Sequence, residues 1–86
     1  MDPQNAHVLD QLFQAETAVE SLIKRGFTVI NVVIGGHAPV VWIQNCTRCA
    51  ELHGALTVAR SGPQGPERVM VAIVERCQVK WTVRGH

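Results

Sequence analysis

The fold is decided by the stretch VMVAIVERCQVKWTV, residues 69–83. Its second half alternates apolar with polar side chains, the period of a strand that has one buried face and one solvated face. The apolar set is Cys77, Val79, Trp81 and Val83, and the polar set is Gln78, Lys80, Thr82 and Arg84. The first half is apolar on both faces, which predicts a strand inside the sheet that is covered on both sides. Because Glu75-Arg76 joins the two halves, residues 69–83 predict a hairpin that belongs to the core.

A long helix is predicted at the N-terminus. Asp2 is placed as its N-cap, Pro3 as its first residue and Gly26 as the left-handed residue that ends it. An apolar stripe with steps of three and four residues is expected to pack on the sheet; it consists of Val8, Leu12, Ala15, Val19 and Leu22. Polar residues, Gln11 among them, fall off this stripe.

The middle of the chain predicts three further strands. Residues 27–34 and 38–43 flank Gly35-Gly36 and predict a hairpin, in which Pro39 marks either a strand end or a sheet edge. Residues 45–54 fit about two helical turns or a loop, and we leave both interpretations open. A third strand is expected over residues 56–60, followed by a turn over residues 61–66 that leads into the C-terminal hairpin.

These elements predict an α+β fold with an N-terminal helix packed on a five-stranded, mainly antiparallel sheet. With 86 residues, the chain is expected to form a single domain, 1–86. Its net charge of +1 is far from the basic balance typical of nucleic-acid-binding proteins. No basic segment leads into an apolar run, and no apolar stretch approaches the ~20 residues of a membrane span. We therefore expect a cytoplasmic protein without a membrane partner.

The cysteines form the sharpest chemical pattern, Cys46-x-x-Cys49-x-x-x-His53, with Cys77 further along the chain. These are ligand types and spacings that zinc prefers, and His37 offers a substitute ligand. A redox pair at Cys46 and Cys49 is a weaker alternative, because the βαβ context of thioredoxin-type motifs is missing. We prefer purely structural cysteines, since Cys77 opens a strand with its side chain directed to the core. No cofactor is expected.

A modest basic strip on the sheet is the second alternative; it would consist of Arg60, Arg68, Arg76, Lys80 and Arg84. A surface for single-stranded nucleic acid needs aromatic rings for stacking, and Trp81 on the last strand is expected to face the core. A solvated face is therefore the preferred interpretation of these charges. No pair of nucleophile and base with a third orienting group can be recognised, so we do not expect an enzyme.

Four segments together resemble small accessory proteins encoded in lambdoid phages and prophages. They are Pro39-Val40-Val41-Trp42-Ile43, Cys49 to Leu52, Gly54-Ala55 and Cys77-Gln78-Val79-Lys80-Trp81. In those proteins an N-terminal helix is followed by a strand that begins with a basic residue and proline, a cysteine shortly before a Gly-Ala strand, and a last strand with a Gly-Cys-Gln-Val start. The similarity runs from about Lys24 to Val83.

The chain departs from this pattern at three places. Ala38 stands where the family has a basic residue, Glu75-Arg76 replaces small turn residues, and Cys46 has no counterpart, unlike Cys49 and Cys77. The resemblance points to no particular enzymatic activity. It implies a protein that binds a host protein and modulates or inhibits it.

The leading hypothesis is thus a non-enzymatic module that binds a host protein, with a defence or regulatory factor as the partner. The surface expected to bind is the outer face of the helix, with Asp10, Phe13, Gln14, Thr17 and Glu20. A sheet edge beside the strand that contains Pro39 is the alternative surface. The rival hypothesis is a small regulatory domain that binds nucleic acid through the basic strip or zinc through Cys46, Cys49, His53 and Cys77. Neither the partner's identity nor the oligomeric state follows from the sequence.

Overall fold

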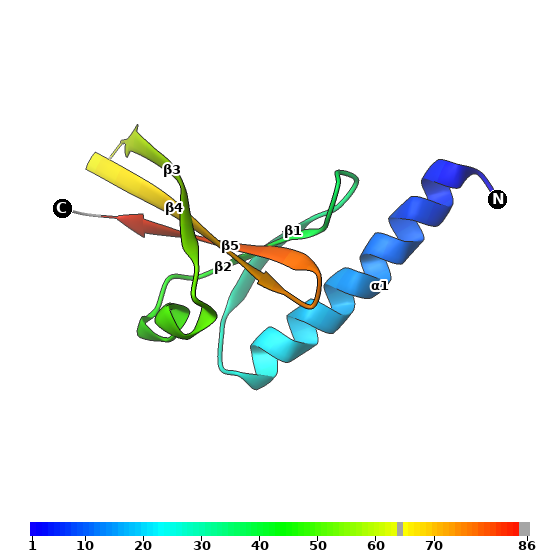
Figure 1. Cartoon of the computed structure of the whole chain (residues 1–86), viewed down its shortest axis with the longest axis horizontal. Coiled ribbons are helices and arrows are strands. Elements are labelled where there is room, and N and C mark those ends of the chain that lie inside the picture. Colours follow the sequence, from blue (N-terminus) through cyan, green and yellow to red (C-terminus); the bar gives the residue numbers. More distant parts are fainter. Residues whose placement is uncertain (64, 85–86) are drawn as a thin grey trace.

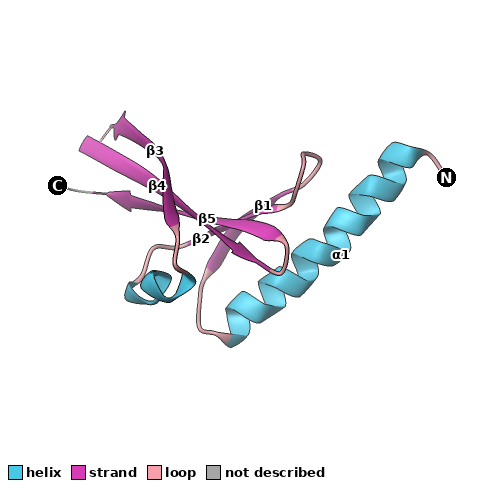
Figure 2. Ribbon diagram, in the orientation of Figure 1, coloured by secondary structure: helices cyan, strands magenta, loops and turns pink. Residues whose placement is uncertain are grey.

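The structure is a computed structural model that describes residues 1–63 and 65–84, and of residues 55–58 and 60 it describes the backbone only. Within this part the chain forms one α-helix, one short 3-10 helix and five strands (Figures 1 and 2). In chain order these are α1 (Pro3–Lys24), β1 (Val29–Val33), β2 (Val40–Ile43), η1 (Thr47–Leu52), β3 (Ala55–Gly62), β4 (Gly65–Val74) and β5 (Cys77–Arg84).

The strands form a single sheet in the order β1-β2-β5-β4-β3. The chain neighbours β1 and β2, β3 and β4, and β4 and β5 pair antiparallel, as short connections require. The exception is β5, which returns to the middle of the sheet and pairs parallel with β2. The predicted α+β fold with a mainly antiparallel sheet is confirmed.

The C-terminal hairpin forms as predicted. Val74 pairs with Cys77, and the two residues between them, Glu75 and Arg76, have φ values of 51° and 65°. Two successive left-handed residues are the geometry of a tight hairpin turn whose twist matches that of the strands. Beyond the turn Cys77 and Val79 are fully buried and Trp81 is 3% exposed, so this strand supplies the centre of the core.

Helix α1 begins and ends where the sequence predicts. The Asp2 side chain accepts a hydrogen bond from the backbone N–H of Gln4 at 2.7 Å, and Pro3 is the first helical residue. At the other end Gly26 has a φ of +89°. The guanidinium of Arg48 in η1 donates to the carbonyl of Arg25 at 2.6 Å, so η1 satisfies one of the carbonyls left open at the helix C-terminus.

The buried face of α1 differs from the predicted stripe. The buried residues are Gln11, Ala15, Ala18 and Leu22, whereas Leu12 is 48% exposed. The alanines allow the helix to approach the strands closely, and Gln11 is held by backbone groups of the β1–β2 loop. Its Oε1 accepts from the N–H of Gly35 at 2.5 Å and its Nε2 donates to the carbonyl of Gly36 at 2.6 Å. These hydrogen bonds make burial of the amide favourable, so the prediction that Gln11 lies off the packing face was wrong.

The helix packs against β1, β2 and β5 on one face of the sheet, and η1 contacts β4. The core on this face joins Ala18 and Leu22 of α1 to Val41, Ala72 and Val79 of the strands, together with other buried residues. The opposite face, which we call the open sheet face, carries Val40, Trp42, Val71, Ile73, Gln78, Lys80 and Arg84 by strand register. By the same register Val69 lies on this face and is 5% exposed, whereas Ile73 is 68% exposed. The prediction that β4 is covered on both sides therefore fails at the Ile73 end of the strand, which no second helix covers.

Of the two interpretations of Pro39, the strand end is confirmed and the sheet edge is wrong. Pro39 directly precedes β2, which lies between β1 and β5, so the strand that follows it is not at an edge. The proline carbonyl accepts a hydrogen bond from the N–H of Gln78 at 3.0 Å, and the missing proline N–H falls outside the strand. The edges of the sheet are β1 and β3. For residues 45–54, the helical interpretation holds, in the form of the 3-10 helix η1.

Candidate binding surfaces

One side of α1 is apolar and turned away from the sheet. We call it the outer helix face and define it by Leu9, Leu12, Phe13, Glu16, Glu20 and Ile23. Leu9, Leu12, Glu16, Glu20 and Ile23 follow each other at steps of three and four, and Phe13 is four residues from Leu9 and three from Glu16. Their side chains therefore lie along one side of the helix. Its apolar members are between 48% and 73% exposed, with Phe13 the most exposed of the four. A surface helix normally turns such residues inward, so this face is a candidate for contact with another molecule.

The predicted helix residues fall into two rows. Phe13 and Glu20 belong to the outer helix face, and both are exposed. Asp10, Gln14 and Thr17 form a neighbouring row, in which Gln14 is half-buried and the Thr17 hydroxyl donates to the carbonyl of Phe13 at 3.1 Å. Of the predicted set, Asp10, Phe13, Thr17 and Glu20 are therefore exposed on α1 and Gln14 is half-buried. Phe13 is the member of the set that is itself apolar.

The N-terminal half of α1 projects beyond the strands. Figure 1 shows it beside the β1–β2 loop, at the end of the molecule opposite the C-terminal end of β5. The molecule is accordingly elongated, with extents of 49 × 27 × 18 Å. His7 Nε2 lies 3.0 Å from the carbonyl of Gly36, so the loop holds this half of the helix through His7 and Gln11. The loop thus fixes α1 through residues outside the outer helix face, and the outer helix face stays exposed to solvent.

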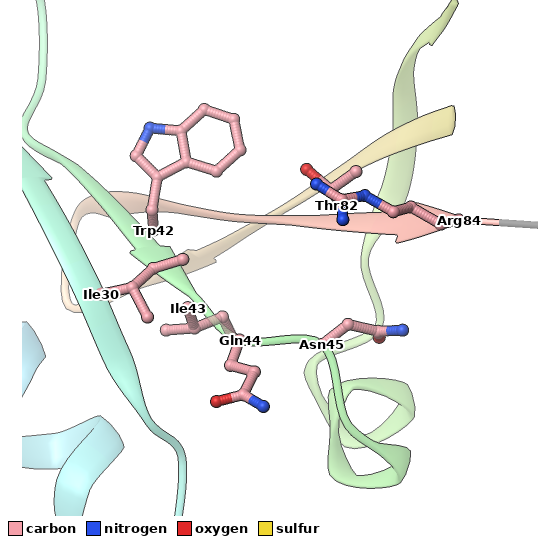
Figure 3. A pocket seen from close by; sticks show the side chains of 7 residues that line it. All are labelled: Ile30, Trp42, Ile43, Gln44, Asn45, Thr82 and Arg84. Carbon is pink, nitrogen blue, oxygen red and sulfur yellow. The ribbon is translucent and has the colours of Figure 1, made fainter. Parts of the chain in front are cut away.

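The open sheet face carries a shallow hollow of about 440 Å³ (Figure 3). Its lining residues are Ile30, Trp42, Ile43, Gln44, Asn45, Thr82 and Arg84. Figure 3 shows Ile30 and Trp42 near each other on β1 and β2, with Thr82 and Arg84 along β5. Nζ of Lys80 lies 5.9 Å from the centre of the Trp42 ring, and Nε of Arg84 lies 3.5 Å from Oε1 of the buried Glu67. Both cations therefore already have partners within the chain.

The structure divides the basic residues of the predicted strip. Lys80 and Arg84 lie on the open sheet face, whereas Arg68 pairs with Val83 and lies on the face of Trp81. Arg76 lies in the β4–β5 turn. The side chain of Arg60 lies outside the described residues. The described members of the strip therefore do not form one continuous basic surface.

The cysteines lie in two different places. Cys46 precedes η1 and Cys49 lies within it, and their Sγ atoms are 3.9 Å apart. Cys77 begins β5, where it is fully buried. Burial raises the pKa of the Cys49 thiol, and burial followed by the charge of Glu75 raises the pKa of the Cys77 thiol. Both buried thiols therefore stay protonated at neutral pH.

The alternative zinc ligands are not brought together in the described part of the chain. No group of three His, Cys, Asp or Glu side chains there is placed to hold a metal ion. Cys46, Cys49 and His53 line a second hollow of about 390 Å³ between η1 and the sheet, together with Arg68 and Trp81. Cys77 is not among its lining residues.

Sequence reasoning missed two residues that shape these surfaces. Trp42 was not singled out, although its position between the buried Val41 and Ile43 predicts by alternation that it faces the other side. Leu12 was assigned to the packing stripe. The signal against that assignment was the pair Ala15 and Ala18, because small residues mark the side of a helix that approaches a sheet closely.

Comparison with known proteins adds no further assignment. Among the described residues, no helix is both long enough and apolar enough to pass through a membrane. No protein-family model matches the chain, and no curated protein or solved structure is significantly similar to it.

Proposed function

We propose that this protein is a non-enzymatic binding module that docks the outer helix face into an apolar groove of another protein. The observation that supports the proposal is the exposure of Leu9, Leu12, Phe13 and Ile23 on one side of a helix whose other side is already packed. Apolar anchors at spacings of three and four residues are the pattern by which a helix is recognised in a groove. A large aromatic side chain among them is a typical centre of binding energy.

The charge of the helix indicates the chemistry of the groove. Between Pro3 and Lys24 the helix carries Asp10, Glu16 and Glu20 against Lys24, which gives 1 − 3 = −2. Glu16 and Glu20 lie within the outer helix face itself and are exposed. A complementary groove is therefore apolar at its floor and carries lysine or arginine at its rim, because like charges opposite each other would weaken the complex.

The biological setting of the proposal comes from the resemblance to lambdoid phage accessory proteins. In that setting the partner is a host protein, and occupation of its groove modulates or inhibits it. Nucleic acid is less well supported as the partner, because Lys80 is stacked on Trp42, Arg84 is paired with Glu67 and Arg68 lies on the opposite face. A surface that neutralises phosphates needs free cations gathered in one place.

The test uses Phe13→Ser combined with Glu20→Arg. The partner is first captured from bacterial host lysate by the tagged protein, identified by mass spectrometry and purified. Its affinity for the wild-type and the doubly substituted protein is then measured by calorimetry. We expect the double substitution to weaken binding at least about tenfold, since it removes an aromatic anchor and reverses a rim charge. Binding by the wild type should also weaken as salt is added.

A matched control is Ile73→Ser, which removes an isoleucine that is 68% exposed on the open sheet face. It should leave the affinity unchanged. Circular dichroism and melting temperature must be the same for all variants, so that loss of binding is not loss of folding. Wild-type affinity in the folded double variant would exclude the outer helix face as the docking surface.

A further inference from the structure

Cys46 and Cys49 are held close together by the local backbone. Cys46 has an extended conformation, with φ −155° and ψ 170°, and its carbonyl accepts a hydrogen bond from the N–H of Cys49 at 3.1 Å. This hydrogen bond closes the first turn of η1 and fixes the two residues one turn apart. Their Sγ atoms are 3.9 Å apart. A disulfide requires about 2.05 Å, so rotation of the side chains together with a small shift of the turn would allow a bond.

The two thiols differ in accessibility. Cys46 is exposed, whereas Cys49 belongs to the core and is 4% exposed. The hollow of about 390 Å³ in front of them is lined by both cysteines and by His53 and Arg68. A small disulfide can therefore reach Cys46 from solvent through a hollow that is also lined by the cationic side chain of Arg68. Cys49 lies next to Cys46 on the buried side. An exposed attacking thiol with a second thiol behind it is the arrangement of a redox-active pair.

We propose that Cys46 and Cys49 form a redox-active dithiol that small disulfides of the glutathione class oxidise. In the first step the Cys46 thiolate attacks one sulfur of glutathione disulfide, which forms a mixed disulfide and releases one glutathione thiolate. In the second step Cys49 loses its proton to solvent and its sulfur attacks Sγ of Cys46, which releases the second glutathione. One dithiol is oxidised by two electrons and one glutathione disulfide is reduced to two glutathiones. The proposal does not depend on the docking function of α1.

Metal binding explains the same pair of thiols less well. A tetrahedral zinc ion in a structural site needs four protein ligands, and the two thiolates supply only two of them. Within the described ranges, 1–63 and 65–84, no third His, Cys, Asp or Glu side chain completes such a site. Cys77 is fully buried at the start of β5 and does not line the hollow. The geometry thus pairs Cys46 with Cys49 and leaves Cys77 outside the pair.

The experiment uses the position of Arg48 between the two cysteines. The reduced full-length protein is incubated in glutathione buffers of increasing disulfide content, quenched with acid, alkylated and digested with trypsin. Trypsin cleaves after Arg25, Arg48 and Arg60, so an oxidised pair links the peptide of residues 26–48 to that of residues 49–60. We expect this linked species to become the main product as the disulfide content rises, with Cys77 still alkylated, and to disappear when dithiothreitol is added.

Two variants give distinct expected products. In Cys49→Ser the mixed disulfide on Cys46 cannot resolve, so one stable glutathione adduct should accumulate. In Cys46→Ser the exposed thiol is lost, and modification of the remaining cysteines should be at least about tenfold slower, because a buried protonated thiol is a poor nucleophile. Each result supports the proposal through a different step.

Three outcomes would overturn it. The first is a stable glutathione adduct on Cys46 in the wild type, without the link between residues 26–48 and 49–60. The second is a disulfide that involves Cys77. The third is one equivalent of zinc that protects Cys46 and Cys49 from alkylation until a chelator removes it.

Discussion

At the scale of single residues, the core depends on the close approach of Trp81 to Gly54. Trp81 is 3% exposed on β5, and Gly54 stands between η1 and β3. A Cβ atom at Gly54 would overlap the Trp81 ring and would lie 3.1 Å from the carbonyl oxygen of Val71. The absence of a side chain at Gly54 is therefore what allows the tryptophan to fill this part of the core. Interiors packed to this density do not tolerate an added methyl group without a shift of their neighbours.

The substitution Gly54→Ala tests this contact. We expect it to destabilise the fold by about 1–3 kcal/mol, because the ring or the backbone of β4 must move. The melting temperature should then fall by at least about 4 °C. The control is Gly36→Ala, at which an added Cβ meets no atom within 4 Å. That variant should stay within about 0.5 kcal/mol of the wild type by urea denaturation. Equal stability of the two variants would contradict the packing described for Trp81.

At the scale of elements, local patterns predicted α1 and the five strands and left residues 45–54 open between helix and loop. They did not always predict which side of an element is buried. The ends of α1 follow from Asp2, Pro3 and Gly26, which act on their immediate neighbours. Its buried side depends on Gln11, whose partners Gly35 and Gly36 are more than twenty residues away in the chain and cannot be inferred from helical spacing. For the same reason the sequence placed Phe13 and Glu20 on the outward side of the helix without identifying the apolar residues Leu9, Leu12 and Ile23 beside them.

Gln11 should hold the β1–β2 loop against α1. In Gln11→Leu the side chain keeps its approximate size but loses the two hydrogen bonds to the loop backbone, each worth about 0.5–1.5 kcal/mol. We expect faster amide hydrogen exchange in residues 34–39 and a loss of about 1–3 kcal/mol in stability. The same change at an exposed helix position, Gln4→Leu, is the control and should leave exchange in this loop unchanged. Unaltered protection of the loop in Gln11→Leu would show that the hydrogen bonds do not hold it.

At the scale of the whole molecule, the parallel pairing of β2 with β5 could not be predicted from the sequence. Each strand shows its own periodicity, but pairing with a parallel strand 38 residues further along, as between Val40 and Gln78, leaves no local pattern in the sequence. This pairing buries β2 inside the sheet, which is why the edge expected beside Pro39 does not exist. It also places Trp42 next to Lys80 on the open sheet face. Alternation within β2 predicts which face the Trp42 ring is on, but it does not predict that Lys80 lies beside the ring. Two buried thiols, Cys49 and Cys77, lie in the resulting core.

These thiols should make the stability of the whole domain depend on alkaline pH. Burial raises the pKa of both above the ordinary value of 9.0, so near and above pH 9 the unfolded chain releases protons that the folded chain retains. The folded state then binds more protons, and the free energy of unfolding falls as pH rises, by about 1.4 kcal/mol per pH unit for each thiol at most. Below that range the stabilisation is fully present. The chain contains no tyrosine, so no phenol titrates in the same window.

The measurement is urea denaturation between pH 7 and 10.5 in the presence of a phosphine reductant, which keeps Cys46 and Cys49 reduced. We expect a plateau up to about pH 8.5 and a decline above it. In Cys77→Ala the free energy of unfolding should fall less steeply with pH, by up to about 1.4 kcal/mol per pH unit. The variant should also be less stable than the wild type at neutral pH, because a buried sulfur is removed. If Cys77→Ala loses stability above pH 9 as steeply as the wild type, the Cys77 thiol is not the group that couples folding to alkaline pH.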